Sequence, residues 1–139
     1  MKSITTLIRI KQRELDALKR QQSLLEKRRE EFYILIIQLG DRLVQEMKLA
    51  KELPEMAHFF GDFSVSIKKR QDQTYIQIRK LDKELDKLAE QLTEKFSELK
   101  KFELAHAAWL KREADKVKRR EQIDMDEVGI RGYLRKDAL

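Results

Sequence analysis

Hydrophobic residues recur at alternating spacings of three and four along the stretch from Thr74 to Trp109. This heptad pattern is typical of a helix that is apolar along one narrow seam, and a second helix with a seam of its own must cover it. The seam positions are Ile78, Leu81, Leu85, Leu88, Leu92, Leu99 and Phe102, followed by His106 and Trp109. The stretch therefore predicts a long helix that needs a helical partner.

The first part of the chain, from about residue 2 to about residue 51, supplies that partner. It carries the same alternation at Ile4, Ile8, Leu15, Leu18, Leu25, Phe32, Ile36, Leu39 and Leu43. Three polar residues, Lys11, Gln22 and Arg29, also occupy seam positions. We expect their stems to lie along the seam while their polar ends reach water. Alternatively, they fix the register or the antiparallel orientation of the helices.

The main punctuation of the pattern lies at Pro54, which is followed by an acidic residue as at a helix start. One interruption between two seams predicts a single hairpin with antiparallel helices. We expect an all-α, single-domain coiled coil with helices over about residues 2–51 and 62–128. The hairpin would span about residues 52–61 and a tail residues 129–139. A second helix that begins near Pro54 is the alternative.

Antiparallel pairing leaves two registers open. In the first, Leu18 faces Leu92 and Leu25 faces Leu85, whereas in the second Leu25 faces Leu92. The second register buries more apolar side chains but requires a longer turn. In both registers the second helix runs past the start of the first, by roughly 25–45 Å at the rise of an α-helix.

Composition supports long helices. Of the 139 residues, 40% are charged and only four are glycine and one proline, which is too few for a loop-rich globule. The chain has no cysteine, which excludes disulfides and thiolate metal sites. Its longest apolar run, residues 32–37, is far shorter than a membrane span. We expect a cytoplasmic protein that reaches a membrane only when another protein recruits it.

Catalytic patterns are missing from the sequence. His58 and His106 are too far apart for a metal-binding pair, and no glycine-rich phosphate loop is present. Residues 124–129 resemble the start of a calcium loop, but Val128 stands where an oxygen ligand is needed. A two-helix coil also offers no concave pocket. We expect a non-enzymatic protein without cofactor or metal.

Beyond Trp109 the seam positions become charged. Residues 111–120 carry six basic residues against Glu113 and Asp115. Such a run can bind acidic protein surfaces, nucleic acid or anionic membrane. Acidic residues are interleaved along most of the chain and few aromatics are placed to stack on bases, so nucleic acid is not expected as a partner.

Aromatic residues gather near the expected hairpin, at Phe59, Phe60 and Phe63. Residues 33–37 add apolar side chains on every side of the first helix. A two-helix coil covers only one side of each helix, so part of this apolar surface faces water or a partner. Either the hairpin folds back and the aromatics cap it, or they form a docking surface at one end of the coil.

The end of the chain, RREQIDMDEVGIRGYLRK from Arg119, resembles the FliJ family of flagellar type III export proteins. Its most specific parts are residues 119–121, residues 125–128, Arg131 and Tyr133. The resemblance implies an antiparallel coiled coil similar to the central stalk of rotary ATPases, monomeric when free and peripherally recruited to the inner-membrane export apparatus. Its implied partners are the hexameric flagellar export ATPase, the cytoplasmic domain of the export gate, and export chaperones.

On this stalk model the paired ends of the two helices enter the ATPase ring, and the hairpin end is free for another partner. The ring-end residues would be Trp109, Arg112, Lys116, Arg119, Arg120, Asp126, Glu127, Arg131 and Tyr133. Two alternatives remain at this stage. One is the equivalent stalk of a virulence type III secretion system, and the other is a basic coiled-coil tether for nucleic acid or anionic membrane.

Overall fold

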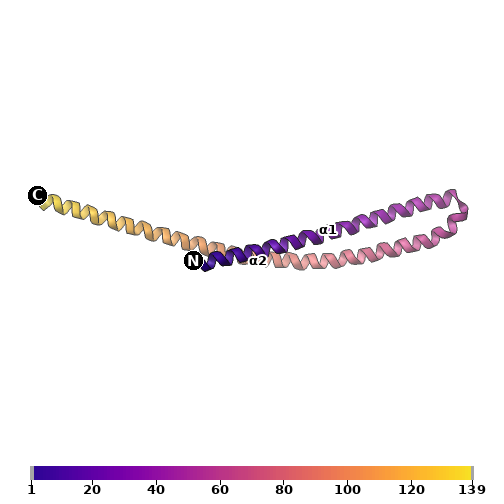
Figure 1. Cartoon of the computed structure of the whole chain (residues 1–139), viewed down its shortest axis with the longest axis horizontal. Helices are drawn as coiled ribbons and strands as arrows, with labels where there is room; N and C mark the ends of the chain where they lie inside the picture. Colours follow the sequence, from indigo (N-terminus) through magenta and orange to yellow (C-terminus); the bar gives the residue numbers. More distant parts are fainter. Residues whose placement is uncertain (1, 139) are drawn as a thin grey trace. The chain divides into compact units, whose positions relative to one another are not determined.

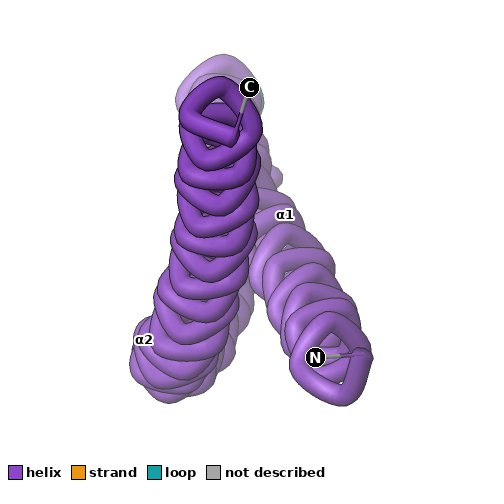
Figure 2. Tube along the Cα trace, turned by 90° about the vertical axis from the view of Figure 1, so that its left-hand side faces the viewer, coloured by secondary structure: helices purple, strands orange, loops and turns teal. Residues whose placement is uncertain are grey.

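Two long helices joined by a short turn make up the chain (Figure 1). The computed structural model describes residues 2–138, and side-chain surroundings for residues 3–136. Helix α1 spans Lys2–Glu52, the 3-10 turn η1 spans Pro54–Met56, and helix α2 spans Ala57–Ala138. Helix colouring covers almost the whole tube in Figure 2, and no described residue lies in a strand. The predicted all-α antiparallel two-helix hairpin is confirmed.

The turn between the helices is shorter than the expected hairpin over residues 52–61. Leu53 donates a backbone hydrogen bond to the Leu49 carbonyl and accepts one from the Met56 N–H, both 2.9 Å long. Pro54 then restarts the helix, because its fixed φ suits a first helical position and its missing N–H is not needed there. The second helix therefore begins at Ala57, close to the alternative start near Pro54.

The chain divides into two compact units, each with a part of both helices. The hairpin unit comprises Glu14–Lys95 and the terminal unit comprises Met1–Arg13 with Phe96–Leu139. The buried residues of the hairpin unit are Leu15, Leu39, Ile67, Thr74, Ile78, Leu81, Leu85 and Leu88. In the terminal unit Leu99 is buried, and Phe102, His106 and Trp109 are half-buried. That residues 1–139 form a single coiled-coil domain stays a prediction.

Polar contacts inside each unit select the first of the two registers. In the terminal unit Lys11 pairs with Glu98, whereas the second register would place Lys11 opposite His106. In the hairpin unit Arg29 pairs with Asp82, whereas the second register would place it opposite Leu88. The short turn agrees with this result, since the second register requires a longer connection.

In the terminal unit α2 continues well past the start of α1. Glu113 is the last half-buried residue of α2, and residues 114–136 are all exposed. We call residues 114–138 the overhang; at the helical rise they extend about 37 Å. In Figure 1 no second helix accompanies this orange to yellow end of α2.

The overhang is helical through the residues expected to form a non-helical tail. Gly129 and Gly132 both lie inside α2, and neither has a positive φ. Expecting the helix to end near residue 128 was wrong, because glycine costs a helix about 1 kcal/mol against alanine but does not by itself end one. The good helix formers around them, among them Met125 and Glu127, favour continuation.

Candidate protein-binding surfaces

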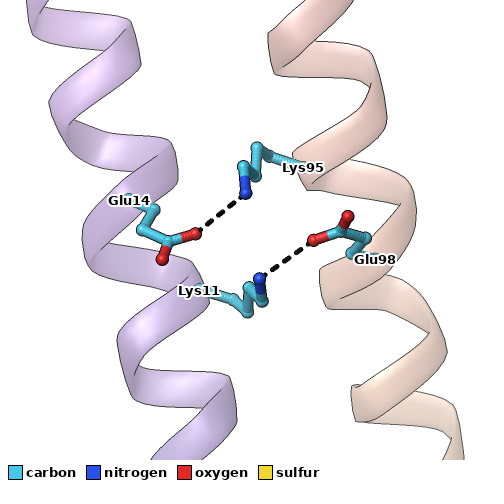
Figure 3. Close-up of polar contacts among 4 residues, drawn as sticks. All are labelled: Lys11, Glu14, Lys95 and Glu98. Carbon is cyan, nitrogen blue, oxygen red and sulfur yellow. Dashed lines mark ion pairs between the residues drawn. The ribbon is translucent and has the colours of Figure 1, made fainter.

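Lysines on the seam form ion pairs with glutamates of the opposite helix (Figure 3). In the terminal unit the Nζ of Lys11 lies 3.1 Å from Oε2 of Glu98. In the hairpin unit the Nζ of Lys95 lies 3.2 Å from Oε2 of Glu14. The polar seam residues therefore do more than reach water, because each pair joins specific positions on two helices and disfavours other registers.

Two further polar contacts hold the hairpin unit together. The Nη1 of Arg29 donates to Oδ1 of Asp82 at 3.0 Å. The Nε2 of Gln71 donates to the Ile36 carbonyl at 3.2 Å, next to Gly40, where a β-carbon would lie 3.6 Å from that nitrogen. Such contacts fix where α1 and α2 meet, while the apolar seam supplies most of the stabilisation.

All twelve seam residues predicted from the sequence lie on the covered side of their helices. Leu15, Ile78, Leu81, Leu85, Leu88 and Leu99 are buried, and Leu18, Leu25, Phe32, Ile36, Leu92 and Phe102 are half-buried.

The seam also extends upstream of the predicted residues, to Ile67 and Thr74. Thr74 is buried because its Oγ1 donates to the Arg70 carbonyl at 2.8 Å, which satisfies the hydroxyl within its own helix. Both residues stand at seven-residue spacing before Leu81. This seven-residue spacing could have identified Ile67 and Thr74 as seam positions from the sequence.

A shallow groove of about 390 Å³ marks the turn end of the hairpin unit. Its lining residues are Arg42, Glu46, Leu49, Ala50, Leu53, Met56, Phe59, Phe60 and Phe63. We call this set the hairpin groove. Phe59 is 63% exposed, with the His58 ring edge-on to it at 5.8 Å. The Arg42 guanidinium lies 5.3 Å from the centre of the Phe63 ring, a cation–π distance.

The hairpin groove separates the two interpretations of the aromatic cluster. Phe60 and Phe63 are half-buried and so contribute to closing the end of the hairpin. Phe59 remains on the surface, and α2 begins at Ala57 without a loop long enough to fold back over it. An exposed aromatic beside an apolar groove is typical of a protein-docking surface.

A second apolar surface lies midway along the hairpin unit. Tyr33, Ile34 and Ile37 on α1 are 45%, 46% and 63% exposed. Tyr75 and Ile76 on α2 are also exposed, at 45% and 44%. The expected surplus of apolar residues around Phe32 is therefore present at the surface, because the two helices cover one side of each other only.

Basic residues dominate the surface where the helix pairing ends. We call Lys111–Arg120 the basic segment; its six basic side chains are all exposed. Lys116 pairs with Glu113 one turn earlier, at 3.3 Å. Just before this segment, Trp109 is half-buried and its ring stacks with that of His106 at 6.2 Å and 11°. The predicted ring-end residues Arg112, Arg119 and Arg120 are exposed along one continuous helix.

The remaining predicted ring-end residues lie further along the overhang and are also exposed: Asp126, Glu127, Arg131 and Tyr133. Tyr133 is 67% exposed, and Oδ1 of Asp126 accepts a hydrogen bond from Nε2 of Gln122 at 3.3 Å. These residues are accessible to a partner, and their roles stay predictions. Within the described residues no helix is long and apolar enough to cross a membrane.

Comparison with known proteins identifies the family of this chain. The family model described as flagellar FliJ protein matches residues 1–138. No curated protein and no solved structure matches the chain. The matching family is flagellar, which decides against the virulence-type alternative. The chain belongs to the flagellar FliJ family and is a non-enzymatic stalk component of the flagellar type III protein export apparatus.

Proposed function

We propose that the chain binds the hexameric flagellar export ATPase through the overhang and the basic segment. The observation that carries this proposal is the single exposed helix beyond Glu113, which begins with the four basic residues Lys116, Lys118, Arg119 and Arg120 and is preceded by Lys111 and Arg112. One helix with its side chains is about 10–12 Å wide, which suits the channel of a ring. Acidic loops lining such a channel would attract the basic segment and orient it.

The hairpin groove would then bind a second export component. It lies in the hairpin unit, on residues that the ring-end contacts do not use, so both partners can bind one chain. Apolar lining with an exposed Phe59 and flanking charges at Arg42 and Glu46 fits a protein surface with a matching apolar centre. The partners proposed for this end are the cytoplasmic domain of the export gate and the export chaperones, with peripheral recruitment to the inner membrane as the consequence.

Stimulation of the ATPase hexamer by purified chain tests the first assignment. Replacing Lys118, Arg119 and Arg120 by glutamate reverses three charges of the basic segment, and we expect binding and stimulation to be lost. The matched control reverses three exposed basic residues of the hairpin unit, residues 68–70, and should leave stimulation intact. Both variants keep the buried seam, which circular dichroism and a thermal melt would verify.

Two results would overturn the assignment of ends. Unchanged stimulation by the basic-segment variant would show that the ring does not recognise this segment. Loss of stimulation only in the control would place the ATPase contact in the hairpin unit. Stimulation by both variants should be measured at more than one salt concentration, because contacts between exposed charges weaken as salt screens them.

A further inference from the structure

The heptad seam of α2 resumes inside the overhang. After the charged seam positions 113, 116 and 120, apolar residues return at Ile123, Ile130 and Leu134, with Glu127 at the seam position between the two isoleucines. Ile123 and Ile130 follow Trp109 at multiples of seven residues, so the face continues the one that packs on α1 in the terminal unit. Their exposed fractions are 58%, 61% and 60%, so this face has no cover within the described part of the terminal unit.

Charge divides this part of the overhang into two halves of opposite sign. Residues 121–127 contain four acidic and no basic residues, and residues 128–136 contain three basic and no acidic residues. A second identical segment laid antiparallel would place each acidic half against a basic half. A parallel copy would instead place like charges together, which is destabilising.

We propose that residues 121–136 pair antiparallel with the same residues of a second copy of this chain. With the two-fold axis near Val128 and Gly129, Ile123 of one copy faces Leu134 of the other, and Ile130 faces Glu127. Asp124 and Arg131 stand beside this apolar stripe and come opposite each other across the pair. Because the two-fold symmetry repeats every contact, the apolar pair Ile123–Leu134 and the ion pair Asp124–Arg131 each form twice.

The interface contains about sixteen residues per chain, which places it among small, weak and reversible interfaces. Pairing also supplies what an isolated helix lacks in water, a partner for its apolar face, and so stabilises a segment that Gly129 and Gly132 weaken. The basic segment lies outside the pair. The proposal departs from the free monomer expected from the sequence. The pair uses overhang residues that are also assigned to the ring end, so a chain bound in the ring is not paired; sedimentation of the chain alone tests the pairing without the ATPase.

Sedimentation equilibrium of the full chain over micromolar to millimolar concentrations tests the pairing. The weight-average mass should rise above the 16.7 kDa of one chain as concentration increases. The variant D124R places arginine against Arg131 twice and should lower the association constant roughly tenfold. The double variant D124R/R131D restores opposite charges at that position and should recover most of the loss.

A matched control separates the ion pair from net charge. E121R changes the charge of the acidic half as D124R does, but Glu121 points away from the apolar stripe, so association should change by no more than about twofold. A chain that stays monomeric throughout, equal effects of D124R and E121R, or no recovery in the double variant would each overturn the proposal. A thermal melt of each full-length variant checks that its paired helices are folded.

Discussion

The ion pair between Lys11 and Glu98 is a sensitive reporter of helix register in the terminal unit. Its charged atoms are 3.1 Å apart, and the Lys11 side chain is only 20% exposed while that of Glu98 is 46% exposed. In the alternative register Lys11 would lie opposite His106 instead. Neutral variants of similar shape, K11M and E98Q, therefore form a double-mutant cycle whose coupling energy depends on the register.

The expected coupling energy follows from the geometry. At 3.1 Å and an effective dielectric constant of about 20, the Coulomb attraction is roughly 5 kcal/mol. Desolvation of both charges and the lost freedom of two long side chains cancel most of it, and exposed pairs measure about 0.2–1 kcal/mol. Because Lys11 is mostly covered, we expect a coupling near the top of that range, about 1 kcal/mol.

Urea unfolding followed by far-UV circular dichroism measures the free energy of unfolding of the wild type, both single variants and the double variant. A cycle on Lys100 and Glu103 serves as control, since that pair lies within α2 at 3.4 Å and its small coupling does not depend on register. Coupling between Lys11 and Glu98 below about 0.3 kcal/mol, the usual error of additivity, would refute the register.

Further substitutions test the seam, the overhang and the hairpin groove. Leu88→Ala empties a position only 4% exposed and should lower the free energy of unfolding by about 2–4 kcal/mol. Leu104→Ala, at a position 69% exposed, should change it by less than about 0.5 kcal/mol in urea unfolding; equal effects would place the core elsewhere. Alanine at Gly129 and Gly132 meets no atom within 4 Å and should favour the helix by about 1 kcal/mol each. Slower amide hydrogen exchange in the overhang would show this, and unchanged exchange would count against a helical overhang. Phe59→Ala should leave the thermal melt unchanged but weaken binding of the gate domain or chaperones in a titration; full-strength binding would exclude the hairpin groove.

Much of this fold is predictable from residue spacing alone. The heptad pattern identifies both helices and the covered side of each, because a narrow apolar seam is stable only against another seam. The register is not predictable that way, since shifting one helix by one heptad still matches apolar positions. Polar residues decide it: Lys11 and Arg29 find partners at Glu98 and Asp82 only in the observed register.

Helix ends and binding surfaces are harder to predict. Glycine at residues 129 and 132 suggested a helix end, but a helix end needs a favourable alternative conformation, and neither glycine adopts a positive φ. Basic and aromatic clusters are visible in the sequence, yet exposure alone is the same for a solvated side chain and for a docking residue. The family identifies the export apparatus, whereas the assignment of each end to a partner requires direct measurement.

The absence of native cysteine allows a direct measurement of which end enters the ring. A photo-crosslinker on Val117→Cys, in the overhang, and one on Phe59→Cys, in the hairpin groove, occupy positions 53% and 63% exposed. With the assembled ATPase hexamer, we predict crosslinks to channel-lining peptides from residue 117 and none from residue 59. Channel crosslinks from residue 59 alone would contradict the assignment of the overhang to the ring.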